Sequence, residues 1–497
     1  MASDEQPEKS SPHHAAGVDY EHVQARYLEE RKLKRHAGPL LLWGLGVGAV
    51  ISGDYFGWNF GLSAGGFWGL AIATFLVAAK YVTMMFSISE LSVAFPHAGG
   101  PYSFSRQAMG PWGGYICGLA VVFEYVLTPA VIVVGIGGYL NAVVPAIPVE
   151  IWWLIAYALF VGVNCWGIEL TLRISLVVTF LAAAILIVFY IAAIPHFKAG
   201  LLFNILPDPG RSLHFPRGIV AGVLKAIPFA IWFYLAIEEL PLAAEETKDV
   251  ARDMPRGINS AMATLVVLSA FTLVLNPGIG LGAARIGVSN APLNDGFVAL
   301  FGVGKMATIL TLIGLTGLVA SFHSIIYAYG RQIYALSRAG YFPRFWSRTL
   351  PRRKTPHVAM IGGAVVGYGV AFVIKYAQKI GADQVGAALL NMAVFGAVVS
   401  HLMMMSSYVI LKKKPFPRPY RSPGGTLFAW ISIVLTVVCL FACFANPDYR
   451  PGVWATCAFY LLGLAYFGFY SRKHLVAEAP EEEFAIIKAA EQELAKK

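Results

Sequence analysis

The sequence predicts an all-α polytopic membrane protein with about 12 transmembrane helices, and two observations carry this prediction. Of the 497 residues, 57% are hydrophobic and 13% are charged, whereas a typical soluble domain has about 45–50% apolar and about 25% charged residues. The apolar residues also fall into about twelve runs, each close to the ~20 residues that cross a ~30 Å hydrocarbon layer. Only short loops and two tails remain, so no separate soluble catalytic domain fits between the runs.

The expected spans follow from the apolar runs and the polar residues between them. They are residues 38–64, 67–94, 112–142, 150–168, 170–194, 217–240, 257–283, 297–330, 357–377, 386–411, 427–446 and 452–471. The polar start of the chain lacks the apolar core of a signal peptide, so we expect an uncleaved first span. Lys and Arg are concentrated in alternate loops. The positive-inside rule therefore predicts a multi-pass protein of the cell (inner) membrane with both termini in the cytoplasm.

Composition also argues against several classes of function. The five cysteines lie within apolar runs and lack metal-ligand spacing, so we expect small buried side chains and no metal site. The net charge of +10 is not gathered on a basic face interleaved with aromatic residues, which disfavours a nucleic-acid partner. No nucleophile–base pair or phosphate-binding loop is evident, so the sequence predicts neither an enzyme nor a cofactor. The expected partners are the lipid bilayer and a transported solute.

Two spans are interrupted by their own sequence. In the first, glycines and a serine surround Asp54 at mid-membrane depth. In the sixth, Pro228 breaks the apolar pattern and Glu238 follows a few residues later. Interrupted helices at matching positions in two halves of a chain indicate a transporter's binding site. A pair of packing kinks is the alternative, although a kink requires no carboxylate.

Four motifs in the same order resemble those of the amino acid–polyamine–organocation (APC) superfamily of transporters. They are GVGAVISGDYF (46–56), ELSVAFPHAGGPYSF (90–104), AEETKD followed by PRGI (244–249 and 255–258), and GRQIYALSRAG (330–340). The resemblance implies a five-plus-five inverted repeat with broken helices 1 and 6, followed by two further helices. The expected units are a cytoplasmic tail (1–37), a transport core (38–411), helices 11 and 12 (412–474) and a cytoplasmic C-terminal tail (475–497).

Asp54 departs from the family pattern. Amino-acid carriers that the motif resembles have a small residue here, and their exposed backbone N–H groups receive the substrate carboxylate. Asp54 would repel that carboxylate and supply a counter-ion for an ammonium group. Such a pair gains about 4 kcal/mol at ~4 Å with an effective dielectric constant of ~20. The sequence thus predicts a substrate with an ammonium group and no carboxylate; alternatively, or in addition, Asp54 caps the second half of the first helix.

Aromatic residues around the two breaks suit a small cation, because each ring face attracts an ammonium group by ~0.5–2 kcal/mol. Those expected to bind substrate are Tyr55, Phe56 and Trp58 on the first helix and Phe229 and Trp232 on the sixth. Trp232 aligns with the aromatic gate of arginine-exchanging relatives, so the resemblance also implies a gating role for it.

Two carboxylates and one serine complete the predicted site. Glu238 aligns with the family's sixth-helix glutamate, which the resemblance links to coupling, although the glycine normally two residues before it is Ala236 here. Glu124, near the middle of the third span, is a second amine ligand, a proton carrier or a structural partner. Ser321 is assigned to the substrate site. His323 and His401 are expected to be satisfied structural groups, and of the two, His323 beside Ser321 is the better candidate to face the cavity.

The sequence therefore predicts a permease that imports a small organic amine by alternating access. The stretch ISGDYFGWN (51–59) resembles the first-helix motif of bacterial ethanolamine permeases, which implies ethanolamine, and choline-like amines, as substrates. Protons are the candidate coupling ion; symport, exchange and uniport stay open. The rival function is a cationic amino-acid or polyamine carrier of the same fold. Lys80 and Lys225 are expected to pair with carboxylates or to extend to the membrane surface.

Overall fold

Twelve apolar helical segments build the described part of the protein. The computed structural model describes residues 13–15, 17–21, 37–96, 99–378, 382–415, 417–477, 479 and 482. Within these residues, ten helices are long and apolar enough to cross a membrane. Two shorter apolar helices, Pro39–Asp54 and Ile219–Ile231, lie where the first and sixth spans were predicted. The all-α polytopic fold and the two interrupted spans are therefore confirmed.

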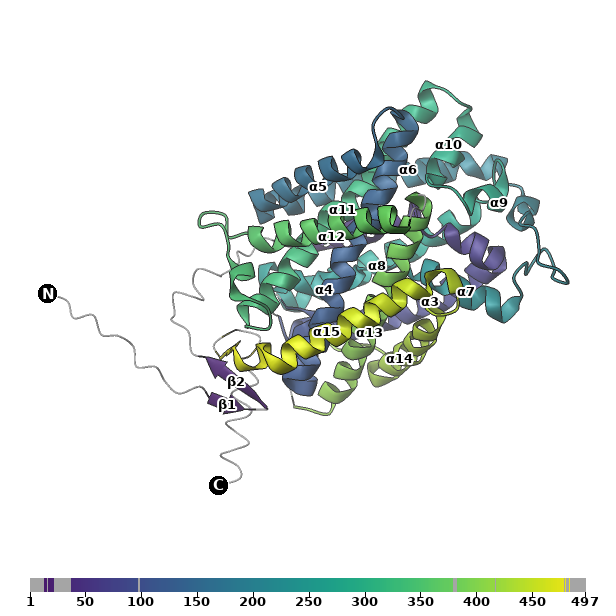
Figure 1. The fold of residues 1–497 in the computed structure, drawn as a ribbon. Coiled ribbons are helices and arrows are strands. Elements are labelled where there is room, and N and C mark those ends of the chain that lie inside the picture. Colours follow the sequence, from purple (N-terminus) through teal and green to yellow (C-terminus); the bar gives the residue numbers. More distant parts are fainter. Residues whose placement is uncertain are drawn as a thin grey trace.

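The long helices run side by side along the molecule, with β1 and β2 at one end and α9 and α10 at the other (Figure 1). The helices are α2 (Pro39–Val50), α3 (Phe60–Ala94), α4 (Pro101–Val143), α5 (Val149–Trp166), α6 (Ile168–Ala193), α7 (Ile219–Ile231), α8 (Val250–Leu275), α9 (Gly282–Ile286), α10 (Pro292–Phe301), α11 (Lys305–Arg338), α12 (His357–Gln378), α13 (Ala382–Lys412), α14 (Gly425–Ala442) and α15 (Arg450–Phe469). Single 3-10 segments are η1 (Ile51–Asp54), η2 (Ile194–His196), η3 (Ala199–Phe203), η4 (Ile237–Glu246), η5 (Arg344–Ser347), η6 (Pro447–Tyr449) and η7 (Ser471–Lys473).

The seventh and eighth spans begin at other residues than predicted, each for a local reason. The seventh span begins at Val250 rather than 257, because Asp249 caps α8 by accepting a hydrogen bond from the backbone N–H of Arg252. The eighth begins at Lys305 rather than 297. The residues before it form the separate helix α10, which ends at Gly302 with φ 74°.

A left-handed glycine separates the first two spans. Gly66 has φ 74°, so residues 60–65 complete the first span and the rest of α3 forms the second. A Cβ atom on Gly66 would lie 2.5 Å from Cδ of Pro216, which precedes α7. Glycine is therefore required here both by the backbone conformation and by the close approach of the chain.

Both ends of the described chain meet in one small sheet. Strand β2 (Val18–Glu21) pairs antiparallel with β1 (His13–Ala15) and parallel with β3 (Leu475–Val476). Residues 18–21 and 475–476 thus lie at the same end of the bundle, as an even number of crossings requires. The N-terminal tail was predicted to be polar, but its strand β2 is buried at Val18 and Tyr20.

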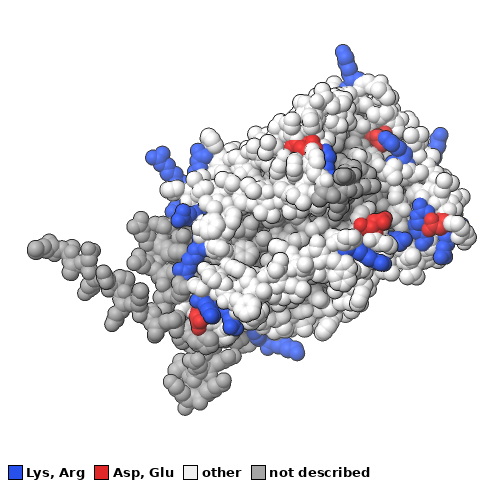
Figure 2. Space-filling model, viewed as in Figure 1, with Lys and Arg blue, Asp and Glu red and all other residues white. Residues whose placement is uncertain are grey.

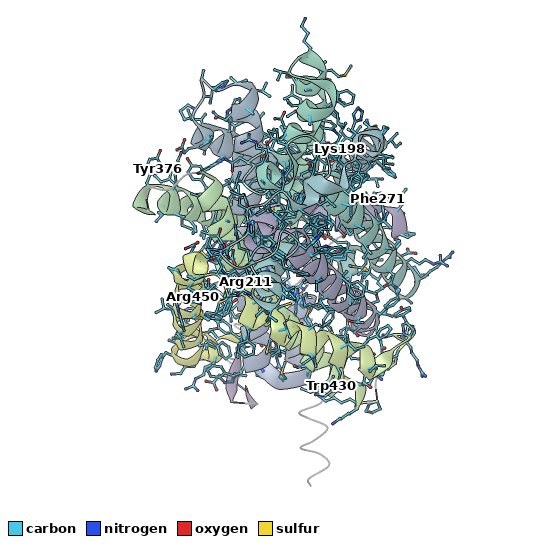
Figure 3. All side chains as sticks on the ribbon, turned by 90° about the vertical axis from the view of Figure 1, so that its right-hand side faces the viewer. Lys198, Arg211, Phe271, Tyr376, Trp430 and Arg450 are labelled. Carbon is cyan, nitrogen blue, oxygen red and sulfur yellow. The ribbon has the colours of Figure 1, made fainter. Side chains whose placement is uncertain are left out.

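The charged side chains on the surface are distributed unevenly along the long axis of the molecule. On the face shown in Figure 2, Lys and Arg gather toward the two ends, and a broad uncharged belt lies between them. Figure 3 looks at the end opposite the terminal sheet, where the exposed residues Lys198 and Arg211 lie in loops and the exposed Arg450 begins α15. An uncharged belt of this kind is what a protein surrounded by lipid requires.

Gly66→Ala should lower the stability of the folded protein by more than about 1 kcal/mol, because alanine is strained at positive φ and its Cβ meets Pro216. Gly162→Ala is the matched control, since that glycine lies within α5 and has nothing within 4 Å of an added Cβ. Thermal unfolding of both variants in detergent measures the difference. Equal melting temperatures would contradict this account of the turn.

Candidate functional site

The first span leaves α-helical geometry over residues 51–59, and the neighbouring helices satisfy part of its backbone. Segment η1 follows α2 and is succeeded by a turn. Ser321 of α11 donates its hydroxyl hydrogen to the Gly48 carbonyl at 2.7 Å and accepts from the Ser52 N–H at 2.9 Å. Thr179 of α6 donates to the Gly44 carbonyl at 2.9 Å. Helices α6 and α11 therefore hold the first half of the broken helix.

The sixth span breaks between α7 and η4, at residues 232–236. Ala236 has φ 77°, so an alanine takes the left-handed conformation for which glycine is better suited. The two breaks pack directly on one another. The Trp232 indole N–H donates to the Phe56 carbonyl at 2.9 Å, and a Cβ on Gly53 would lie 2.5 Å from the Trp232 carbonyl oxygen.

Asp54 is the last residue of η1 and is completely buried. Its carboxylate lies beside the Thr272 hydroxyl of α8, close enough to Tyr190 and Tyr234 to interact with them electrostatically. Within the described residues, however, neither of its oxygens accepts a hydrogen bond of good geometry. A buried carboxylate is thus held at the break, with no cationic partner among the residues that the structure describes.

The predicted aromatic residues separate into two groups. Phe56 and Trp232 lie at the meeting point of the breaks: Phe56 lies against Gly135 of α4 and Gly386 of α13, and Trp232 lies against Gly57. Phe229 contacts Phe60, with ring centroids 6.2 Å apart, and Tyr449 at 6.1 Å.

The side chains of Tyr55 and Trp58 contact other residues of the protein. The Tyr55 hydroxyl donates to the Ala182 carbonyl of α6 at 2.6 Å, and its ring packs on Gly317 of α11. Trp58 stacks on Phe233 with ring centroids 5.5 Å apart. The structure therefore brings Phe56 and Trp232 together and directs Tyr55 toward the surrounding helices.

His323 is a hydrogen-bonded structural residue, as the sequence predicted. Its Nδ1 lies 2.9 Å from the Asn164 amide nitrogen of α5, and its Nε2 lies 3.1 Å from the Thr171 carbonyl oxygen of α6. His323 therefore joins helices α5, α6 and α11. Ser321, on the same helix, forms both of its hydrogen bonds, one as donor and one as acceptor, with the backbone of the broken first helix.

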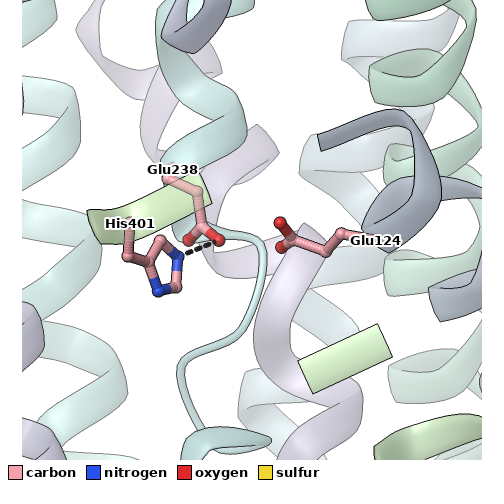
Figure 4. Close-up of side chains that lie close together, drawn as sticks. All are labelled: Glu124, Glu238 and His401. Carbon is pink, nitrogen blue, oxygen red and sulfur yellow. Dashed lines mark hydrogen bonds and ion pairs between the residues drawn. The ribbon is translucent and has the colours of Figure 1, made fainter. Parts of the chain in front are cut away.

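Glu238 and Glu124 meet in a second buried cluster (Figure 4). His401 of α13 places Nε2 2.7 Å from Glu238 Oε1, and Lys80 of α3 places Nζ 2.7 Å from His401 Nδ1. Ligand atoms of Glu124, Glu238 and His401 all lie within 4.8 Å of one another. Four helical segments thus contribute one ionisable group each to a single cluster.

Sequence reasoning missed Lys80 and His401 as members of this cluster. Lys80 was expected to bind a carboxylate directly or to extend to the surface, and it instead binds the histidine. The available signal was the presence of two ionisable residues in apolar spans, which is costly unless they are paired. Lys225, by contrast, remains partly exposed on α7.

A divalent metal ion fits this cluster poorly, although two carboxylates and a histidine are common ligands. The His401 nitrogen that would bind a metal is already hydrogen-bonded to Glu238, and the Lys80 ammonium lies 2.7 Å from the other ring nitrogen. A fixed positive charge at that distance repels a dication.

Comparison with known proteins identifies the family. The amino acid permease family model matches residues 41–479. The chain belongs to the amino acid permease family. This permease is therefore a membrane transporter rather than an enzyme, and the resemblance to the APC superfamily is confirmed.

Several curated relatives cover most of the permease. It is 26% identical to an uncharacterized transporter of Rhizobium meliloti over 88% of this chain and 92% of the relative. It is 24% identical to the branched-chain amino acid permease BcaP of Bacillus subtilis, over 90% and 95%. It is also 24% identical to the methylthioribose transporter of the same organism, over 86% and 92%.

Ser321→Ala should destabilise the permease by on the order of 1–2 kcal/mol, because the Gly48 carbonyl and the Ser52 N–H both lose a buried partner. Thr316→Ala is the control: Thr316 is half-buried on the same helix and donates its hydroxyl hydrogen to the Ile313 carbonyl of its own helix. Melting temperatures in detergent test this, and a larger loss for Thr316→Ala would contradict the role assigned to Ser321.

Proposed function

We propose that the permease imports a small organic amine without a carboxylate, with ethanolamine as the first candidate and choline-like amines as related ones. The observation that carries this proposal is the buried carboxylate of Asp54, which has the Thr272 hydroxyl beside it but accepts no hydrogen bond of good geometry from the described residues. A buried charge without a partner is costly. A substrate ammonium group would supply the missing positive charge and hydrogen-bond donors.

The surroundings of Asp54 suit the rest of such a substrate. Thr272 and Asn276 are one helical turn apart on α8, and Thr272 lies beside Asp54. Neither the oxygen nor the nitrogen of the buried Asn276 amide has a hydrogen-bond partner among the described residues. In the proposed complex, this amide binds the hydroxyl group of ethanolamine.

The permease is closed around this region on both sides. On one side, Phe229 contacts both Phe60 and Tyr449. On the other side, Arg331 of α11 binds Glu246 of η4 at 2.5 Å. Alternating access would therefore require the two broken spans to move against α4 and α11, with Trp232 gating the space between the breaks.

Glu238 and Glu124 are the proposed coupling groups, with protons as the coupling ion. Glu238 stands two residues after the left-handed Ala236, so it moves with η4 when the break changes conformation. We also propose that the terminal sheet lies on the cytoplasmic side of the inner membrane, as the positions of Lys and Arg in the sequence predict.

A carrier of amino acids is the alternative function. Two relatives are named for amino acids: the branched-chain permease of Bacillus subtilis, and the D-serine/D-alanine/glycine transporter of Escherichia coli K12, which is 23% identical over 73% of this chain and 78% of its own. A third is named for methylthioribose, which is not an amino acid. None of these names mentions ethanolamine, so the substrate proposal depends on Asp54.

Asp54→Asn should reduce uptake of labelled ethanolamine at least 100-fold while the protein remains folded, because the amide is isosteric but uncharged; a ~4 kcal/mol ion pair corresponds to more than this factor. Asp208→Asn is the matched control, since Asp208 is exposed and binds Arg217 outside the spans. Uptake into proteoliposomes is the measurement. Unchanged uptake by Asp54→Asn would refute the counter-ion role.

Competition separates the amine carrier from its rivals. Excess ethanolamine and choline should reduce uptake of labelled ethanolamine, because both offer a cation without an acid. Arginine, lysine and putrescine should have little effect, because the first two bring a carboxylate and putrescine brings a second charge. Strong inhibition by arginine or putrescine would favour a cationic amino-acid or polyamine carrier.

A further inference from the structure

The cluster around Glu238 contains a charge pattern that substrate binding at Asp54 does not explain. Lys80, Glu124, Glu238 and His401 are all fully buried and come from α3, α4, η4 and α13. Each is expensive to bury alone. Their combined protonation state must therefore nearly neutralise the cluster.

With Lys80 as an ammonium ion, the hydrogen bonds assign the tautomer of His401. A lysine ammonium has donors only, so His401 Nδ1 accepts from Lys80 at 2.7 Å. His401 Nε2 then carries the ring hydrogen and donates it to Glu238 Oε1 at 2.7 Å. The imidazole is neutral in this arrangement and connects the Lys80 cation to the Glu238 carboxylate.

Glu124 adds a second carboxyl group to the same place. It faces Glu238 (Figure 4), and a carboxyl oxygen of each residue lies within 4.8 Å of the other. Ser400 donates to Glu124 Oε2 at 3.4 Å, whereas Glu124 Oε1 and Glu238 Oε2 accept nothing from the described residues. Two carboxylates cannot hydrogen-bond unless one is protonated, and two like charges in contact disfavour double ionisation.

We infer that Glu124 and Glu238 share a single proton, and that Lys80, acting through His401, is the positioning residue that sets how tightly this proton is held. With one proton on the pair, the Lys80 cation and the remaining carboxylate charge balance. Loss of the proton leaves one uncompensated negative charge. Lys80 therefore makes release of the proton easier than it would be from an isolated buried pair.

The location links this proton to the moving part of the carrier. Glu238 belongs to η4, next to the left-handed Ala236, whereas Lys80, Glu124 and His401 lie on long continuous helices. Separation of Glu238 from His401 is less costly when Glu238 leaves as a neutral acid. This coupling step rests on the proposed transport function, but the existence of the shared proton does not.

Other titratable groups face the cluster and enter its pH dependence. They are Tyr81 of α3, Tyr125 of α4, Glu239 of η4, Cys439 and Cys443 of α14, and Tyr460 of α15. The Lys80 ammonium nitrogen lies over the Tyr81 ring, 4.0 Å from the centroid of that ring. The test must therefore assign the titrating proton by substitution.

Infrared spectroscopy of the purified full-length permease in nanodiscs detects the shared proton without any substrate. The carboxylic acid C=O band that disappears in Glu124→Gln identifies the pair. Its titration midpoint should move upward by at least about one pH unit in Lys80→Met, because removal of an adjacent cation makes the proton harder to release. A midpoint unchanged in Lys80→Met, or no band lost in Glu124→Gln, would overturn the inference.

Two matched variants keep this test decisive. Lys80→Gln also removes the charge but keeps a donor for His401, and it serves if Lys80→Met is not recovered as folded protein. Lys375→Met removes a lysine that binds Glu150 away from the cluster and should leave the midpoint unchanged. Because no amine is added, a failure of ethanolamine transport leaves this result interpretable on its own.

Discussion

Backbone that leaves helical geometry inside a membrane must find its hydrogen-bond partners within the protein, and this constraint organises the centre of the permease. Ser321 and Thr179 bind the first broken helix from the surrounding helices, and the Trp232 indole binds the Phe56 carbonyl across the two breaks. Close contact at Gly53 leaves no room for a side chain between them. The two breaks therefore form one connected structure, and a change of backbone conformation in either break alters its contacts with the other.

Buried carboxylates lie on both sides of the contact between the two breaks: Asp54 on one side, and Glu238 with Glu124 on the other. Asp54 faces α6 and α8, whereas Glu238 and Glu124 face α3 and α13. Aromatic rings lead from one to the other: Tyr234, which interacts with Asp54, lies 5.6 Å from Tyr81, and the Tyr81 ring lies 5.3 Å from His401. In our proposal, the first set binds a substrate cation and the second binds a proton. Their separation allows each to be substituted independently.

Much of the fold was predictable because membrane crossing imposes a length and a composition that a single sequence reveals. The breaks were also predictable, since Gly53, Pro228 and the nearby carboxylates disrupt otherwise apolar spans. The cluster around Glu238 was not predictable, because Lys80 and His401 are 321 residues apart in the sequence and no local pattern connects them. The hydrogen-bond partners of Ser321 and His323 were equally hidden, because those partners lie on other helices.

The central claim is that the substrate site accepts an ammonium group and rejects a carboxylate. Ethanolamine and L-serine test it most directly, because L-serine is ethanolamine with a carboxylate added. Isothermal titration of the purified permease with each compound should show binding of ethanolamine and at least about 100-fold weaker binding of L-serine, since like charges at ~4 Å repel by ~4 kcal/mol. Binding of L-serine as tight as that of ethanolamine, or tighter, would contradict the account.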